Sequence, residues 1–181
     1  MVITIVGVSG SGKTTVGRLL ARNLNWQFFE GDDFHSLANI AKMRAGSPLS
    51  DVDRSSWLAA IRAQMQAILA GRQPAVFACS ALKRAYRDFL RLDGVQFVYL
   101  KGDYELFRRR LECRTGHFFD ARLLASQFET LEEPECGLVV DAAQAPAAIV
   151  NEVIRRLELC RNDDGPDTRR SWNGESRKPD R

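Results

Sequence analysis

The stretch Gly7-Val8-Ser9-Gly10-Ser11-Gly12-Lys13-Thr14 matches G-x-x-x-x-G-K-[ST] at every position. In such a loop, glycines allow the backbone to wrap around an anion with its N–H groups pointing inward. A β-branched run over residues 2–7 leads into the loop, and apolar residues at helical spacing follow it from Val16 to Leu24. The helix after the loop would present its positive N-terminus to phosphates. This context favours a phosphate-binding loop over a chance glycine-rich turn.

The loop therefore predicts a nucleotide site that uses ATP and Mg²⁺ as cofactors. Lys13 is expected to reach the β- and γ-phosphates, and the hydroxyl of Thr14 to ligate Mg²⁺. The residues predicted to bind the nucleotide at this loop are Gly7, Val8, Ser9, Gly10, Ser11, Gly12, Lys13, Thr14 and Thr15.

Outward from the loop, strand-like and helical segments alternate along the chain. Apolar runs predict strands at 2–7, 26–29, 74–79, 95–100 and 138–140. Helical spacing predicts helices after the loop, over 55–70, around 86–90 and from Pro146, whereas 36–54 is weakly helical or irregular. Repeated β–α units require a parallel sheet covered on both faces, so the sequence predicts a doubly wound α/β domain over residues 1–161.

Composition narrows the class of partner. The formal net charge is +3, and no basic helix face with interleaved aromatics indicates a nucleic-acid partner. No apolar run is long enough to span a membrane, and no basic leader precedes the first strand, so we expect a cytoplasmic protein. Four scattered cysteines and two histidines disfavour a zinc site.

The last twenty residues differ from the rest in composition. Residues 162–181 hold five acidic residues, five basic residues and one aromatic residue, Trp172. This polarity predicts a disordered tail. A partner-binding peptide anchored by Trp172 is the alternative.

Two absences distinguish among P-loop proteins. No Asn/Thr-Lys-x-Asp guanine-reading motif is found, and the third strand ends in Ala78-Cys79-Ser80 instead of the acidic residues that a motor ATPase uses. Acidic residues follow the second strand instead, at Asp32 and Asp33. At the carboxyl end of a strand beside the P-loop, such a carboxylate is placed to take a proton from an acceptor hydroxyl. The alternative is an ordinary cap between strand and helix.

Several further motifs follow one another along the chain. With Gly7 to Thr14 they are Glu30-Gly31-Asp32-Asp33-Phe34-His35, Asn39 with Lys42-Met43, Gly46 with Pro48-Leu49, Asp51-Val52-Asp53-Arg54, Trp57-Leu58, Ala78-Cys79-Ser80-Ala81-Leu82-Lys83-Arg84 with Tyr86-Arg87, Arg114-Thr115-Gly116-His117-Phe118, Leu123-Leu124 and Ser126-Gln127-Phe128. In this order they resemble the gluconokinases of the shikimate-kinase-like group of P-loop kinases, and the resemblance extends from about residue 2 to about residue 158.

The resemblance implies an α/β P-loop NTPase fold with a five-stranded parallel sheet sandwiched by helices and a small mobile lid. It also implies transfer of the γ-phosphate of ATP to the 6-hydroxyl of D-gluconate, and commonly a homodimer. By the same resemblance, Asp32 takes the proton of the acceptor hydroxyl, and Arg54 and Lys42 meet the substrate carboxylate. The other residues expected to line the acceptor pocket are Asp33, His35, Ser80, Lys83 and Arg84.

Each of these assignments has an ordinary structural alternative. His35 would otherwise cap the following helix, and Lys42 and Arg54 would be solvated surface charges. Arg54 follows Asp51-x-Asp53, so a local ion pair is a second alternative for it.

A lid is expected at about residues 105–119. Arg110 and Arg114 are spaced by one helical turn, lie on one face and are expected to act together on the charge of the migrating phosphoryl group. Arg110 is assigned to the nucleotide and Arg114 to catalysis, and the sequence leaves open which of the two contacts the transferred phosphate. Gly116 would act as a hinge. The alternative is a solvated basic helix face.

Two other functions remain open from the sequence. One is a kinase for a different small molecule, such as shikimate or a nucleotide, although the predicted pocket is polar and suits a polyhydroxy carboxylate. The other is a regulator that binds ATP without catalysis, which the intact Lys13, Thr14 and Asp32 disfavour.

Overall fold

The computed structural model describes residues 1–45, 47, 49–113 and 121–159. Its centre is a five-stranded, wholly parallel sheet, as the sequence predicts, and the strand order is β2-β3-β1-β4-β5. The chain reaches β3 on one side of β1 and β4 on the other, so the strand order switches direction at β1. Ligand crevices of open α/β sheets lie at this switch point, and the P-loop follows β1 directly. The strands are β1 (Val2–Val6), β2 (Gln27–Glu30), β3 (Ala75–Ala78), β4 (Val95–Lys101) and β5 (Leu138–Asp141).

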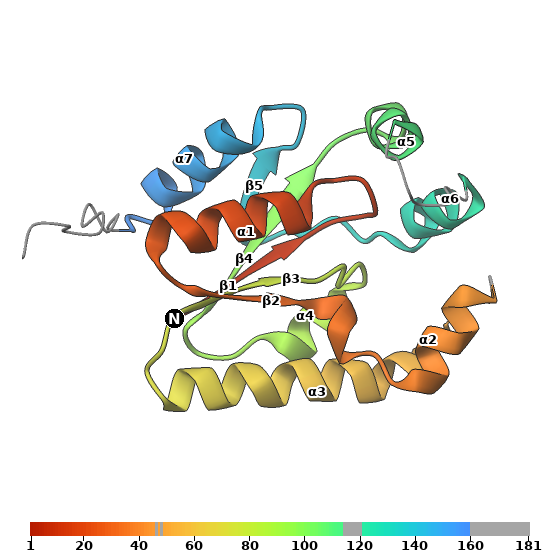
Figure 1. Ribbon diagram of the computed structural model, residues 1–181, viewed down its shortest axis with the longest axis horizontal. Coiled ribbons are helices and arrows are strands. Elements are labelled where there is room, and N and C mark those ends of the chain that lie inside the picture. Colours follow the sequence, from red (N-terminus) through yellow and green to blue (C-terminus); the bar gives the residue numbers. More distant parts are fainter. Residues whose placement is uncertain (46, 48, 114–120, 160–181) are drawn as a thin grey trace, which may run out of the picture.

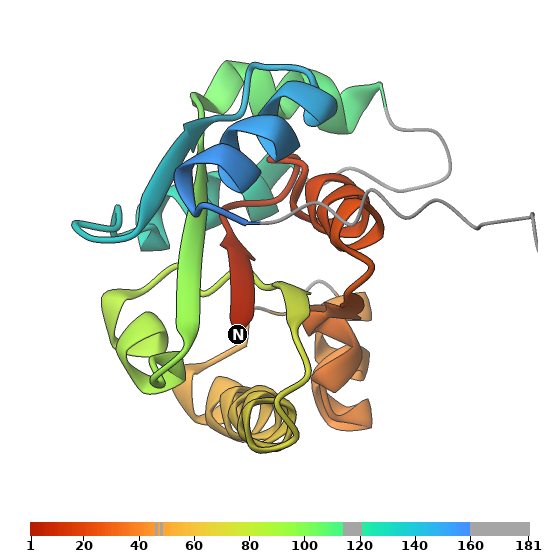
Figure 2. The same ribbon diagram turned by 90° about the vertical axis from the view of Figure 1, so that its left-hand side faces the viewer.

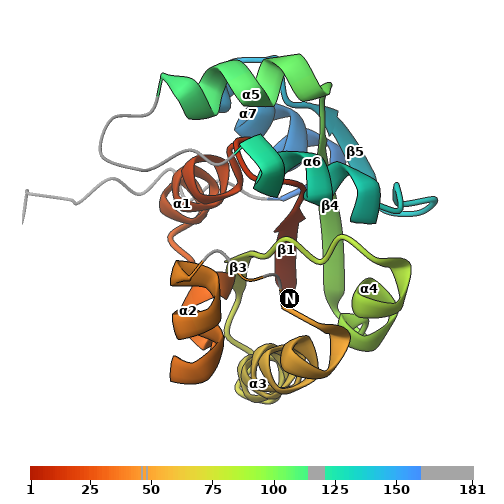
Figure 3. The ribbon, with the colours of Figure 1, turned by 90° about the vertical axis from the view of Figure 1, so that its right-hand side faces the viewer.

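Helices cover both faces of the sheet, as parallel strands require. Helices α1 and α7 lie on one face, and α3 and α4 lie on the other (Figures 1 and 2). The remaining helices gather beyond the carboxyl ends of the strands, the side that Figure 3 shows face-on. The helices are α1 (Lys13–Leu24), a 3₁₀ turn η1 (Gly31–Phe34), α2 (Leu37–Arg44), α3 (Asp51–Ala70), α4 (Arg84–Leu90), α5 (Tyr104–Glu112), α6 (Ala121–Thr130) and α7 (Pro146–Arg156).

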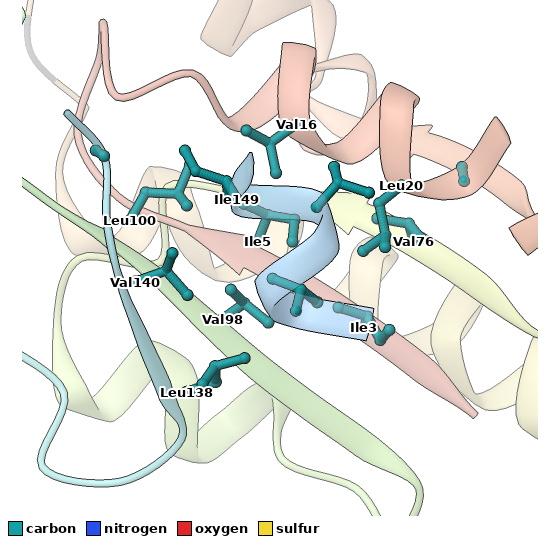
Figure 4. Packing of buried hydrophobic residues seen from close by; sticks show 14 of the residues in the cluster. Ile3, Ile5, Val16, Leu20, Val76, Val98, Leu100, Leu138, Val140 and Ile149 are labelled. Carbon is teal, nitrogen blue, oxygen red and sulfur yellow. The ribbon is translucent and has the colours of Figure 1, made fainter. Parts of the chain in front are cut away.

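Strand β1 is buried on both faces and separates two hydrophobic clusters. Ile3 and Ile5 pack with α1 and α7, where Figure 4 shows them beside Val16, Leu20 and Ile149. Val2 and Val6 point to the opposite cluster under α3 and α4. Since successive side chains of a strand alternate between faces, the near-continuous apolar run at 2–6 is what a central parallel strand needs. This packing holds the P-loop at a rigid edge of the sheet.

The predicted start of α3 was wrong by four residues. The helix begins at Asp51 instead of Ser55, because Ser50 and Asp53 form a capping box: Ser50 Oγ accepts from the Asp53 N–H at 3.2 Å, and Asp53 Oδ2 accepts from the Ser50 N–H at 2.9 Å. In the segment predicted to be weakly helical or irregular, Leu37–Arg44 is a helix whose N-cap Ser36 accepts from the Asn39 N–H. The two caps thus fix the starts of the helices that carry two predicted acceptor-site residues, Lys42 on α2 and Arg54 on α3.

The lid prediction falls partly outside the described residues. Helix α5 ends at Glu112 with Cys113 as its cap, so Arg110 lies in the last helical turn. Arg114, Gly116 and the end of the predicted lid lie outside the described residues, and so does the predicted tail at 162–181. Within the described part of the chain, no helix is both long and apolar enough to cross a membrane.

Candidate active site

The P-loop has the geometry of an anion-binding loop. Gly12 is the N-cap of α1 with φ 95°, a conformation that favours glycine, and it offers no side chain to cap the first N–H groups of the helix. The hydroxyl of Ser11 is buried and has no hydrogen-bond partner, which is unusual unless a ligand completes the site. Lys13 Nζ donates to the carbonyl of Val8 at 2.9 Å, across the loop. These groups suit phosphate oxygens.

Glu30 lies at the end of β2 beside the P-loop, and the sequence reasoning gave it no role. Its carboxylate is hydrogen-bonded to the side chain of Thr14, the predicted Mg²⁺ ligand. Burial raises the pKa of Glu30, the bond to Thr14 opposes that rise, and the charge of Asp32 adds to it. Among the described residues no three His, Cys, Asp or Glu side chains form a metal cluster. Thr14 and Glu30 are the protein oxygens that could face a cation here beside nucleotide phosphates, the kind of partner that Mg²⁺ prefers.

The turn η1 presents Asp32 at the carboxyl end of β2. Asp32 is exposed, and its carbonyl accepts from the N–H of His35 at 3.2 Å. Helix α3 holds this turn in place, because the buried indole N–H of Trp57 donates to the carbonyl of Gly31 at 2.7 Å. The ring of His35 stacks on Trp57 with centroids 4.6 Å apart and planes 8° apart. Asp32 is therefore an open carboxylate on a rigid support.

The surroundings of His35 favour its neutral form. Burial lowers its pKa, the Asp32 carboxylate opposes this effect, and Arg54 adds to it. Its Nδ1 is buried without a hydrogen-bond partner. A neutral imidazole between Asp32 and Arg54 can donate to or accept from a hydroxyl group.

Replacing Gly31 tests how strictly the turn is placed. A Cβ at Gly31 would lie 2.6 Å from the backbone oxygen of Ala78 and 3.2 Å from Cys79 Cα, so β2 would have to move away from β3. We expect Gly31→Ala to lower stability by roughly 1–3 kcal/mol, the usual scale of overpacking, and to reduce turnover by displacing Asp32. Thermal unfolding and initial rates measure the two effects. Gly71→Ala is the matched control, because its added Cβ would meet nothing closer than 3.4 Å; equal behaviour of the two variants would contradict the account.

A cationic group lies at the far end of the same edge, where α3 begins and the loop after β3 leads into α4. We call Arg54, Lys83 and Tyr86, together with Asp51, the Asp51 cluster. Lys83 Nζ donates to both carboxylate oxygens of Asp51, at 2.8 and 2.9 Å, and the hydroxyl of Tyr86 donates to the same carboxylate. Arg54 Nη1 lies 3.3 Å from Asp51 Oδ1 and 3.4 Å from the Tyr86 hydroxyl. The local ion pair that the sequence offered as an alternative for Arg54 is thus present.

Packing against α3 joins these parts. Trp57 of α3 donates to the carbonyl of Gly31 and stacks on His35, and the same helix carries Arg54 at its start, next to Tyr86 and Lys83. The charges of Asp32 and Arg54 both influence the pKa of His35, and we call the set from the P-loop through Asp32 and His35 to the Asp51 cluster the row. The row runs from the phosphate loop, past an exposed carboxylate and a neutral histidine, to the cations of the Asp51 cluster. A ligand that lies along it would have a hydroxyl at one end and an anionic group at the other.

Other predicted acceptor residues lie less centrally. Lys42 pairs with Asp53 at 2.6 Å, next to the start of α3. Ser80 is half-buried in the loop that carries Lys83. Asp33 lines a hollow of about 290 Å³ whose wall also includes Glu30, Arg18 and Phe28, so it adjoins the nucleotide end of the row.

Arg84 is directed away from the row. It pairs with Asp88 and Glu135 and lines a hollow of about 300 Å³ on the outer side of α4. The structure therefore brings Lys83 to the row and turns its neighbour Arg84 outward.

Helices α5 and α6 contact the nucleotide side of the site. Gln127, on α6, accepts from the N–H of the P-loop residue Ser9 at 2.6 Å. Arg110 donates to the carbonyl of Ala142, just after β5, at 2.7 Å. The sequence gave no structural reason to pair Gln127 with Ser9, because 118 residues separate them.

The fold and this row of groups define a class. A P-loop at the switch point of a parallel sheet, with a carboxylate opposite it, is the arrangement of kinases that phosphorylate small molecules. In agreement, the family model described as shikimate kinase matches residues 9–158.

Closer relatives specify the family. The chain is 42% identical over 163 residues to the thermoresistant gluconokinase of Escherichia coli K12, covering 87% of this chain and 93% of that one. It is 42% identical to the gluconokinase of Gluconobacter oxydans, covering 86% and 90%. The crystal structure of a gluconokinase from Sinorhizobium meliloti superposes with a TM-score of 0.78 at 46% identity, covering 86% of this chain and 90% of that one. The chain belongs to the gluconokinase family, so it is an ATP-dependent phosphotransferase with an alcohol acceptor.

Proposed function

We propose that this protein is a gluconokinase, which transfers the γ-phosphate of ATP to the 6-hydroxyl of D-gluconate and releases 6-phospho-D-gluconate and ADP. The observation that supports it most is the row from the P-loop through Asp32 and His35 to Arg54 and Lys83. An extended sugar acid matches this row, with its terminal hydroxyl near the P-loop and its carboxylate near the cations. Membership of the gluconokinase family gives the same acceptor.

The transfer is a single in-line step in this proposal. The oxygen of the 6-hydroxyl forms a bond to the γ-phosphorus as the bond from that phosphorus to the bridging oxygen of ADP breaks. The hydroxyl proton passes to the Asp32 carboxylate. Lys13 leaves the carbonyl of Val8 and neutralises charge on the β- and γ-phosphates.

The acceptor is oriented by groups along the row. Arg54, Lys83 and Lys42 attract the carboxylate, and a guanidinium fork is well suited to carboxylate oxygens. His35 and Ser80 offer hydrogen bonds to the hydroxyl groups between. Arg110 and Arg114 are proposed to meet the nucleotide when the lid closes, and Asp33 is proposed as an outer residue of the pocket. Arg84 has no role in this proposal, because it pairs with Asp88 and Glu135 on the outer side of α4.

Mg²⁺ is a proposed part of the site, held by the hydroxyl of Thr14 with Glu30 hydrogen-bonded to it. When bound, the ion supplies positive charge to the phosphate oxygens. The orphaned hydroxyl of Ser11 and the carboxylate beside Thr14 are consistent with such a polar site. A homodimer and a cytoplasmic location stay predictions from the sequence.

Glu30→Gln separates this role from a structural one. If Glu30 orders the Mg²⁺ shell, the variant should need roughly tenfold more Mg²⁺ for half-maximal rate.

The same variant should change the pH dependence of stability. Because the pKa of Glu30 is raised in the folded protein, its contribution to stability is fully present below pH 4.5 and is lost as the pH rises through the folded pKa. At pH 7 the ionised Glu30 therefore opposes folding. The variant should therefore unfold at a higher temperature than the parent at pH 7, and this advantage should shrink toward pH 4. An unchanged Mg²⁺ requirement would remove Glu30 from the site.

An acceptor panel tests the function itself. ADP release is measured with D-gluconate, shikimate, nucleoside monophosphates, other sugar acids and no acceptor. We expect gluconate to stimulate release far more than the others. A nucleotide as the best acceptor, or no stimulation by any compound, would overturn the proposal.

A further inference from the structure

Asp51 occupies the position that an anionic ligand would be expected to take. Its carboxylate accepts from Lys83 through both oxygens and from the Tyr86 hydroxyl, and it lies 3.3 Å from Arg54. The cations of the cluster are only partly exposed, at 26% for Arg54 and 31% for Lys83, whereas Asp51 is 61% exposed. The carboxylate therefore lies on the solvent side of its partners, where an incoming acceptor arrives.

The charges of the cluster leave it with one net positive charge. Arg54 and Lys83 contribute two positive charges and Asp51 one negative charge. Tyr86 remains neutral, because burial and its bond to Asp51 raise the pKa of its hydroxyl. The bond from Lys83 holds the pKa of Asp51 at about 2, so Asp51 stays ionised throughout the neutral range. The neighbouring pair of Lys42 and Asp53 adds no net charge.

We infer that Asp51 is a specificity-determining residue: its carboxylate competes with the carboxylate of the acceptor for the same hydrogen-bond donors and positive charges. In the empty enzyme it holds Lys83, Arg54 and Tyr86 in place. When a sugar acid binds, its carboxylate shares these donors with Asp51, and the two like charges lie close together. The enzyme thus binds its acid weakly enough to release the product, which carries the same carboxylate. This inference rests on the proposed function, since it assumes that the acceptor is a sugar acid.

Asp51→Asn tests this inference, because asparagine has nearly the same shape and keeps an oxygen for Lys83 while losing the charge. We expect the KM for D-gluconate to fall roughly fivefold, the scale of one like-charge repulsion at close range in a water-filled site. The KM for ATP should be unchanged. D-glucitol, which has the same chain and terminal hydroxyl but no carboxylate, should gain nothing. Asp88→Asn is the matched control: Asp88 pairs with Arg84 and Arg91 on α4, outside the cluster, and this variant should match the parent.

Two outcomes would overturn the inference. A higher KM for gluconate in Asp51→Asn, with ATP unaffected, would make Asp51 an organiser of the cations and not a competitor. Equal gains for gluconate and glucitol would show that charge is not the cause. Calorimetric titration of gluconate into both proteins measures binding without turnover, and tighter binding to the variant than to the parent supports the inference. This result would hold even if gluconate bound without being phosphorylated, an outcome that defeats the proposed function alone. Thermal unfolding checks that the variant is folded.

Discussion

Asp32→Asn is expected to lower kcat by roughly 10²–10⁴-fold, the range that a positioned general base contributes. The amide cannot accept the proton of the acceptor hydroxyl, yet it keeps the size of the carboxylate on the η1 turn. Asp32 is exposed and lies on a turn that Trp57 supports from below, so the substitution should not disturb folding. Single-turnover rates at saturating ATP and gluconate measure the loss directly.

Nucleotide binding should survive this change. Asp32 lies on η1, outside the P-loop, so the Kd for ATP should stay within about threefold of the parent, a difference well below one large electrostatic contact. Asp93→Asn, at an exposed loop before β4, is the control for a surface carboxylate and should behave as the parent. A variant at Asp32 that retains most of the rate would show that another group takes the proton, or that none is needed.

Lys13→Met is the second substitution with a large expected effect. In the described structure Lys13 lies across the P-loop and contacts the carbonyl of Val8 at 2.9 Å, and it is the P-loop cation that reaches the phosphates. Removing a charge aimed at the migrating phosphoryl group costs roughly 10²–10³-fold in kcat. Because the same charge holds the ground-state phosphates, the Kd for ATP should also rise.

The pattern of loss distinguishes Lys13 from Asp32. The Lys13 variant should lose both affinity for ATP and rate, whereas the Asp32 variant should lose rate alone. Lys101→Met removes a lysine that pairs with Glu133 at the surface, 2.7 Å away, and is the matched control. If Lys13→Met kept its rate and lost only affinity, the role assigned to Lys13 in the transfer step would be wrong.

The fold followed from the sequence wherever a local pattern determined it. The apolar run at 2–6 and the glycines after it predicted a strand followed by a phosphate loop, and both are present. The central position of that strand was not predicted. The start of α3 was missed because its signal is a polar capping box, Ser50 with Asp53, which lies ahead of the apolar stripe that begins at Trp57. The single-sequence pattern gave no separate prediction for α6, whose role here is its contact with the P-loop.

The sequence indicated which residues belong to the site better than it indicated which of them form hydrogen bonds and ion pairs with one another. Asp32, His35, Arg54 and Lys83 lie in one row, and the resemblance to gluconokinases had grouped them. The bonds of Glu30 to Thr14 and of Asp51 to Lys83 depend on how distant segments pack, and no spacing rule gives them. Lys83 and Arg84 are neighbours in the same motif, but only Lys83 joins the Asp51 cluster. Arg84 pairs with Glu135 on the other side of α4, which the motif did not indicate.

The position of the transferred phosphate tests the central claim most directly, because the row assigns the two ends of the acceptor. Wild-type protein, ATP, Mg²⁺ and D-gluconate are incubated, and the product is examined by phosphorus–proton correlation in nuclear magnetic resonance spectra. The account predicts a single phosphate ester on carbon 6, the end farthest from the carboxylate that Arg54 and Lys83 attract. An ester at any other carbon, or ADP formed without a phosphorylated sugar acid, would contradict it.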